Sequence, residues 1–185
     1  KHSLHLIEDC AQAHLATYQN QFVGTFGTAG TFSFFPSKNL GAYGDAGAII
    51  TNNDEMAEKC RIFCNSGAIN KHDHVIEGMN SRMDALQAAI LRKKLPHLAK
   101  WTNQRRQLAL RYNDQLSKIS EIQCPQERPD TNHAYHLYVI RTRDRDQLKN
   151  HLESRGILTN IHYPTPLPLL PAYDYLQCDA PDFPQ

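Results

Sequence analysis

The stretch TFSFFPSKNLGAYGDAGAII, residues 31–50, restricts the fold of this chain more than any other part of it. It begins with a short apolar run, Thr31–Phe35, passes through a turn and a glycine-rich loop, and leads into a second apolar run, Ala48–Thr51. Short apolar runs bounded by turn residues are typical of buried strands. Lys38 lies in the turn, just beyond the first predicted strand. The pattern therefore predicts an α/β sheet with a lysine at the edge where open sheets bind ligands.

A lysine at that edge can act as a nucleophile. Partial removal from water disfavours the charged ammonium, lowers its pKa and leaves an amine that can attack carbonyl carbon. Schiff-base chemistry with pyridoxal 5′-phosphate (PLP) requires such an amine. A solvated turn lysine is the alternative, and Lys38 on its own favours that interpretation, because buried lysines are rare.

A second stretch, LHLIEDCAQ at residues 4–12, supplies the other groups that PLP chemistry needs. It reads as an apolar strand ending in Glu8 and Asp9. A carboxylate there can pair with a protonated pyridine nitrogen, which makes the PLP ring an electron sink. Gln12 can hydrogen-bond the phenolic oxygen of the ring, and the hydroxyl of Ser33 suits a phosphate. An ordinary strand-to-helix corner explains the same residues, so both interpretations stay open.

Four separated motifs carry a resemblance to a known family. They are EDCAQ, SFFPSKNLGAYGDAGAI, GMNSRMDALQAAIL and ILTNIHYPTPLPLLPAY, and together they span nearly the whole chain. In this order they resemble the DegT/DnrJ/EryC1/StrS family of PLP-dependent sugar aminotransferases. The resemblance implies an α/β fold of the PLP fold type I class. It also implies transfer of an amino group, usually from glutamate, to a keto-sugar carried on a nucleotide, for surface polysaccharide or deoxyamino-sugar biosynthesis.

The resemblance also assigns roles to individual residues. Lys38 matches the lysine that forms the Schiff base with PLP, Asp9 the partner of the pyridinium nitrogen, and Gln12 the residue near the ring oxygen. Ser33 matches a phosphate ligand. Asn80, in GMNSR, matches an asparagine that reaches the phosphate of the neighbouring subunit's cofactor, and this match implies a homodimer.

The proline-rich segment HYPTPLPLLPAY, residues 162–173, is expected to be a loop, because proline interrupts helices and sheets. His162 and Tyr163 offer polar and stacking groups to a sugar nucleotide, whereas a proline-stiffened tail is the alternative. Many members of the family that the chain resembles carry a second histidine a few residues further on, where this chain has Pro168. The identity of the sugar therefore stays open.

Local signals predict most of the remaining elements. Residues 13–30 form a turn-rich segment or short hairpin. Asn52 and Asn53 precede DEMAEKCRIFC and are expected to cap a helix there. Ser81 and Asp84 make a capping-box-like start to the helix RMDALQAAILRKKL, which Pro96 is expected to close.

A second long helix is predicted from about Leu98 to Leu116, with Trp101, Leu108 and Tyr112 facing inward. Beyond it, AYHLYVIRT and ILTNI are predicted strands on either side of a helix, RDQLKNHLESRG, that ends at Gly156.

We place a domain boundary near Lys100. In the family that the chain resembles, the helix pair joins a large cofactor domain to a small α+β domain. The resemblance therefore implies that residues 1–100 are the later part of the PLP-binding domain and that residues 101–185 are the small carboxyl-terminal domain. The family also has a long amino-terminal portion that this chain lacks, so we expect the chain to be part of a longer protein.

Composition limits the partners. Lysine and arginine number 20 and aspartate and glutamate 19 among 185 residues, so no basic field indicates nucleic acid. No long apolar span indicates a membrane. Five cysteines, an odd number without regular spacing, favour reduced thiols in the cytoplasm. Cys60 and Cys64 with His72 and His74 suggest zinc, but the thiols lie on the apolar face of a predicted helix, so we predict no metal site.

Two other functions fit parts of the pattern. One is a PLP-dependent sugar dehydratase of the same fold; such relatives usually have histidine in place of the lysine, so Lys38 argues against it. The other is a regulatory or binding member of the fold without turnover. The presence of Lys38, Asp9, Gln12 and Ser33 together favours catalysis.

Overall fold

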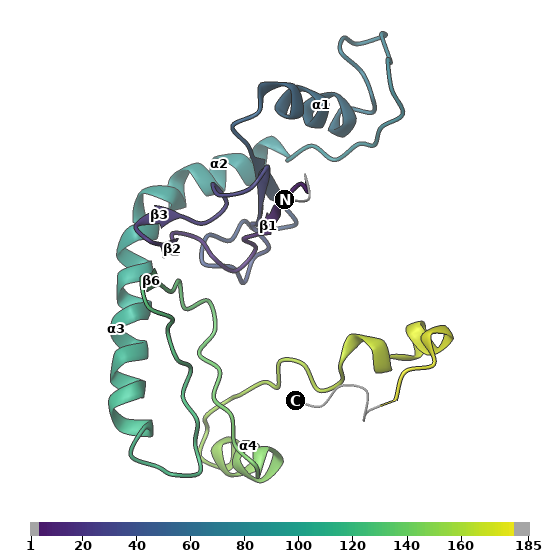
Figure 1. Ribbon diagram of the computed structural model, residues 1–185. Helices are drawn as coiled ribbons and strands as arrows, with labels where there is room; N and C mark the ends of the chain where they lie inside the picture. Colours follow the sequence, from purple (N-terminus) through teal and green to yellow (C-terminus); the bar gives the residue numbers. More distant parts are fainter. Residues whose placement is uncertain (1–3, 180–185) are drawn as a thin grey trace. The chain divides into compact units, whose positions relative to one another are not determined.

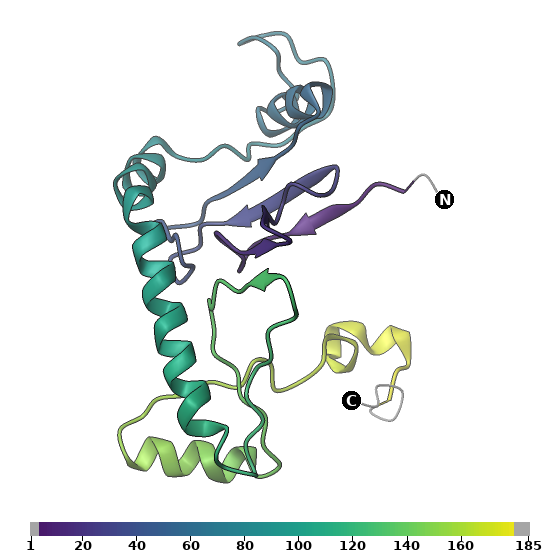
Figure 2. The same ribbon diagram turned by 60° about the vertical axis from the view of Figure 1, so that its left-hand side comes forward.

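A mixed sheet forms around the two stretches that the sequence singled out. The computed structural model describes residues 4–179. In it, β1 (Ile7–Asp9) pairs in parallel with β4 (Ala29–Ser33), and β4 pairs antiparallel with β5 (Gly47–Ile50) (Figure 1). Figure 2 shows these strands side by side. The mixed α/β class is confirmed, although β4 begins and ends two residues before the predicted strand Thr31–Phe35.

The register of the parallel pair decides which side chains share a face. Asp9 lies opposite Thr31, and Ser33 comes two residues further along β4. Because side chains alternate across a strand, Asp9, Thr31 and Ser33 lie on one face. Glu8 and Phe32 lie on the other. The carboxyl ends of β1 and β4 meet at the same edge, as parallel strands require.

A second small sheet joins the early hairpin to a distant segment. β2 (Thr17–Tyr18) pairs antiparallel with β3 (Gln21–Phe22) and with β6 (Thr131–Asn132). The hairpin within residues 13–30 is thus confirmed. Its pairing with residues more than a hundred positions later has no local signal.

The helices follow the predicted order. α1 (Asp54–Cys64) is capped by Asn53, whose Oδ1 accepts the Met56 N–H at 2.9 Å. α2 (Ala85–Lys94) begins after Asp84, whose side chain makes no capping hydrogen bond. The predicted capping box is therefore wrong: the backbone N–H of Ser81 donates instead to the Cys64 carbonyl at 3.0 Å.

Pro96 follows shortly after the end of α2, as predicted, but the chain stays helical beyond it. It lies within the 3₁₀ turn η1 (Leu95–His97), which leads directly into α3 (Leu98–Leu116) (Figure 1). The bounds of α3 match the prediction. Its predicted inner face does not: the side chains of Leu108 and Tyr112 are 57% and 52% exposed, and the buried residues are Leu98, Thr102 and Ala109.

The main hydrophobic core lies beneath the loop that follows Lys38. Residues of that loop pack with residues of the α2–α3 junction, and the buried members are Leu40, Ala42, Leu91 and Leu98. The loop is therefore held by the core rather than by flanking strands alone.

The chain divides into two compact units. The first comprises the residues up to Ile119 together with Cys124–Tyr138, and the second comprises Ser120–Gln123 and the residues from Val139 on. All elements named above belong to the first unit. The predicted domain boundary near Lys100 concerns the domains of the family fold and stays a prediction.

The second unit holds α4 (Arg145–Ser154), η2 (Leu167–Leu169) and η3 (Pro171–Leu176). Gly156 follows α4 with a φ of +77°, a left-handed conformation that suits the glycine predicted to end this helix. The two strands predicted around α4 are wrong, because neither residues 134–142 nor residues 157–161 form a strand. The first segment has only an isolated β-bridge, between Arg141 and Gln123. Within residues 4–179, no helix is long and apolar enough to cross a membrane.

Candidate functional site

Two of the predicted cofactor residues share the sheet edge. Asp9, at the end of β1, and Ser33, at the end of β4, lie on the same face by register. Asp9 is exposed, and its Oδ1 accepts the Ala11 N–H at 3.0 Å, which orients the carboxylate. The Ser33 Oγ accepts the Phe35 N–H at 3.2 Å, so its own hydrogen is available to donate. An acid and a hydroxyl donor thus stand where sheets of this kind bind ligands.

Lys38 and Gln12 lie in the segments that continue from these strand ends. The Lys38 backbone N–H donates to the Phe35 carbonyl at 2.8 Å, closing the turn that follows β4. The Lys38 side chain is half-buried, and Gln12 is exposed in the turn after β1.

The glycine-rich loop after Lys38 is fastened to α2. The Gln87 Oε1 accepts the Tyr43 N–H at 2.8 Å, and the Lys94 ammonium donates to the Gly41 carbonyl. Glycine is required at position 41, because a Cβ there would lie 2.3 Å from the Pro36 carbonyl oxygen. These contacts fix the loop on the carboxyl side of the lysine.

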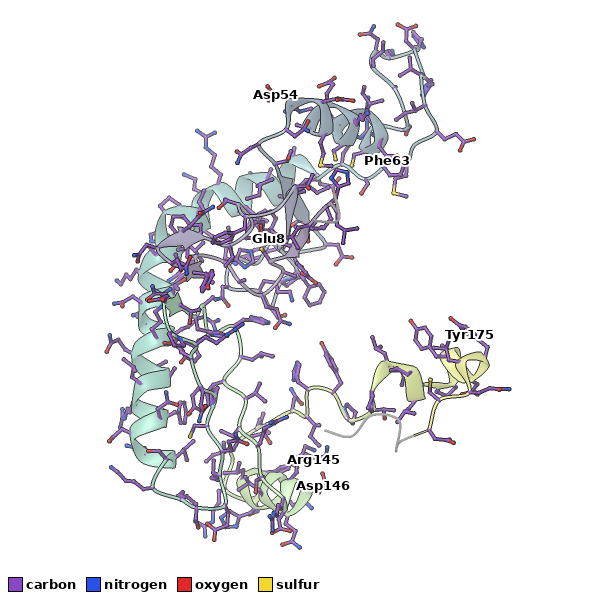
Figure 3. The ribbon with its side chains drawn as sticks, viewed as in Figure 1. Glu8, Asp54, Phe63, Arg145, Asp146 and Tyr175 are labelled. Carbon is purple, nitrogen blue, oxygen red and sulfur yellow. The ribbon has the colours of Figure 1, made fainter. Side chains whose placement is uncertain are left out.

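Glu8 stabilises the loop next to the site through hydrogen bonds, a role that the sequence did not predict. Its carboxylate accepts backbone N–H bonds from Gly24 at 2.6 Å, from Phe26 at 2.7 Å and from Gly27 at 2.7 Å. Figure 3 shows Glu8 on the β1 strand. Burial raises the pKa of Glu8, but the bonds from Gly27, Gly24 and Phe26 together outweigh it, and the net pKa lies below the ordinary 4.5. The residue next to Asp9 thus ties β1 to the loop 24–27.

Glu8→Gln is expected to destabilise the protein by about 1–3 kcal/mol at neutral pH, because an amide can replace only part of this charge-assisted set. A carboxylate whose pKa is depressed by folding stabilises the folded state above its unfolded pKa, and this stabilisation is lost as pH falls below 4.5. The difference in unfolding free energy between wild type and variant should therefore shrink in acid. Urea unfolding across this range measures it, with Glu58→Gln on the surface of α1 as control; a constant difference would contradict the assignment.

His14 is a second group that the sequence did not single out. The residue is 4% exposed, and the centroid of its ring lies 5.5 Å from that of the Phe32 ring and 5.8 Å from that of the Phe34 ring. Burial lowers the pKa of His14 to about 4, and the nearby charges of His136 and Lys38 act in the same direction. The His14 imidazole is therefore neutral at physiological pH, and Lys38 is one of the charges that act on it.

Asn80 is not brought to this edge by any hydrogen bond or strand pairing within residues 4–179. Asn80 is exposed and pairs with Asn65 in an isolated antiparallel bridge. His162 and Tyr163 are exposed in the second unit, with ring centroids 4.9 Å apart. Their roles toward a second subunit and a substrate stay predictions.

Comparison with known proteins shows which family the chain resembles along its length. The sequence profile of the DegT/DnrJ/EryC1/StrS aminotransferase family matches residues 1–185. The dTDP-3-amino-3,4,6-trideoxy-alpha-D-glucose transaminase of Streptomyces venezuelae is 45% identical over 173 residues, which are 94% of this chain and 46% of that protein. A pleiotropic regulatory protein of Geobacillus stearothermophilus is 49% identical over 175 residues, 94% of this chain and 47% of its own length.

A solved structure shows the same fold. The crystal structure of S. venezuelae DesV in complex with a ketimine intermediate superposes with a TM-score of 0.92 at 45% identity, covering 94% of this chain and 47% of DesV. The chain spans about half the length of the curated relatives it matches. With the family profile matching along its whole length, the chain belongs to the DegT/DnrJ/EryC1/StrS aminotransferase family.

Proposed function

We propose that this chain carries the catalytic lysine and the pyridine-nitrogen partner of a PLP-dependent aminotransferase of fold type I that acts on nucleotide-linked keto-sugars. The observation that carries the proposal is the shared sheet edge: Asp9 and Ser33 on one face, with Lys38 in the turn that follows. Membership of the aminotransferase family supports it.

The donor set fits PLP group by group. The aldehyde of the cofactor needs an amine, which Lys38 supplies, and the pyridine nitrogen needs an acid, which Asp9 supplies. The phenolic oxygen needs a hydrogen-bond donor, supplied by Gln12, and the phosphate needs further donors, one of which is Ser33. The Asp9 Oδ1 is engaged by Ala11, and its other oxygen makes no hydrogen bond within residues 4–179, so it is available to an N–H partner.

Each residue then has a defined task. With PLP bound, the Lys38 amine would hold the cofactor covalently and, when free, would act as the base that carries a proton between the α-carbon of the amino acid and carbon C4′ of the cofactor. Asp9 keeps the ring nitrogen protonated by ion pairing. Ser33 would donate its hydroxyl hydrogen to the phosphate. When bound, PLP supplies an electron sink for the electrons released at the α-carbon.

The proposal extends to the substrates, the assembly and the compartment. Glutamate is the proposed amino donor, and a nucleotide-linked keto-sugar contacted by His162 and Tyr163 is the proposed acceptor. The transaminase relative supports this class of acceptor. We also propose a homodimer in which Asn80 reaches the phosphate in the neighbouring site, and a cytoplasmic location.

The direct test supplies full-length protein with PLP, glutamate and a set of nucleotide-linked keto-sugars. We expect 2-oxoglutarate and an amino sugar to form in equal amounts with at least one acceptor. Cofactor that binds without amino transfer to any acceptor would contradict the proposed reaction.

A regulatory function is the second candidate, because one relative at 49% identity bears a regulatory name. The same experiment separates the two. A protein that binds PLP at Lys38, transfers no amino group and changes its oligomeric state or partners with PLP would support regulation instead.

A further inference from the structure

The residue directly after Lys38 is buried and hydrogen-bonded through its side chain. Asn39 is 7% exposed, and both ends of its amide are engaged. Its Nδ2 donates to the Ala134 carbonyl at 2.9 Å, and its Oδ1 lies 3.2 Å from the His136 Nδ1. A buried side chain with both polar ends bonded has one orientation, so the backbone at position 39 is fixed.

These partners also determine the tautomer of His136. The Ala134 carbonyl can only accept, so the Asn39 NH₂ group must face it and the Oδ1 must face His136. Because the Oδ1 also only accepts, the His136 Nδ1 must carry the hydrogen. The bond is therefore a directed one, Nδ1–H to Oδ1, and a side chain without a donor at that place breaks it.

The segment that carries His136 is anchored to α3. The Arg105 Nη1 donates to the carbonyls of Tyr135 and His136, both at 3.2 Å. The Arg106 Nε donates to the His133 carbonyl at 2.9 Å. The segment is thus tied to α3, and it can serve as a rigid support for what it contacts.

We propose that His136 is a positioning residue for Lys38: by fixing Asn39 through the Nδ1–H to Oδ1 bond, it fixes the backbone from which the lysine amine projects. This inference rests on the proposed function of Lys38. A lysine side chain has four rotatable bonds, so its amine can already take many positions. Motion of the backbone at Lys38 would add further positions to these. A fixed backbone restricts the amine to the volume where the cofactor aldehyde lies.

The test compares substitutions that differ only in where they place a donor. Asparagine places its side-chain N–H₂ where histidine has Nδ1, whereas glutamine places it one bond further out and leucine has none. We expect His136→Leu and His136→Gln in full-length protein to attach PLP to Lys38 about tenfold more slowly than wild type. His136→Asn should attach it within about threefold of the wild-type rate.

The readouts are the rate at which the visible absorbance of lysine-bound PLP appears and the fraction of Lys38 labelled after borohydride reduction. Thermal unfolding of the cofactor-free variants checks folding, and His72→Leu in an exposed loop is the matched control. If His136→Leu does not fold, the comparison of His136→Asn with His136→Gln still tests the inference. Equal rates for His136→Asn and His136→Gln would overturn the inference. No attachment to Lys38 in wild type would instead overturn the proposed function.

Discussion

Replacing Lys38 with alanine is expected to abolish covalent attachment of PLP and to lower the rate of amino transfer by at least about 10³-fold. The reason is that this one amine has two tasks, the bond to the cofactor and the proton transfer at the α-carbon, and general-base catalysis alone is worth about 10²–10⁴. Absorbance of the purified protein reports attachment, and single-turnover kinetics with glutamate report the proton transfer.

Two matched variants separate this role from loss of charge. Lys38→Arg keeps a cation in the turn but offers no amine for a Schiff base, so it should behave like alanine. Lys71→Ala removes an exposed lysine from a polar loop and should leave both measurements unchanged. Covalent attachment that persists in Lys38→Ala would show that another lysine holds the cofactor.

Asp9→Asn is expected to retain PLP and to lose about 100-fold or more of the turnover. Asparagine keeps the shape of the side chain, and its Oδ1 can still accept the Ala11 N–H. It cannot, however, hold a proton on the ring nitrogen by ion pairing, and a charge-assisted interaction of this kind is worth about 3 kcal/mol. Turnover measured at saturating PLP isolates this effect from binding.

The control for Asp9→Asn is Asp114→Asn, which changes an acid of similar size on the surface of α3. Asp114 is 74% exposed, and within residues 4–179 its only ion-pair partner is Lys118, just past the end of the helix, so turnover should not change. Full turnover in Asp9→Asn would contradict the assignment of Asp9 as the partner of the pyridine nitrogen.

Local signals were enough to predict the elements that depend on neighbours in sequence. The Asn53 cap of α1, the bounds of α3 and the glycine stop at Gly156 are each set by residues within a few positions. The order of Asp9, Ser33 and Lys38 along predicted strands and turns likewise sufficed to place them near one sheet edge, because parallel strands share that edge.

Features that depend on distant partners could not be predicted this way. The three acceptor bonds of Glu8 reach residues sixteen to nineteen positions away, and the Asn39–His136 bond spans ninety-seven. The inner face of α3 was predicted wrongly for the same reason. Its hydrophobic period allows Leu108 to face inward, but the surrounding segments bury Ala109 instead. The prediction of a strand at residues 134–142 was wrong because a strand also needs a partner of matching register.

Reductive trapping tests the central claim most directly. Full-length protein is loaded with PLP, reduced with borohydride, digested, and mapped by mass spectrometry for the lysine that carries the pyridoxyl group. The account predicts that the group is found on the peptide containing Lys38, at close to one per chain. A pyridoxyl group on any other lysine, or none on Lys38 when PLP is bound, would contradict it.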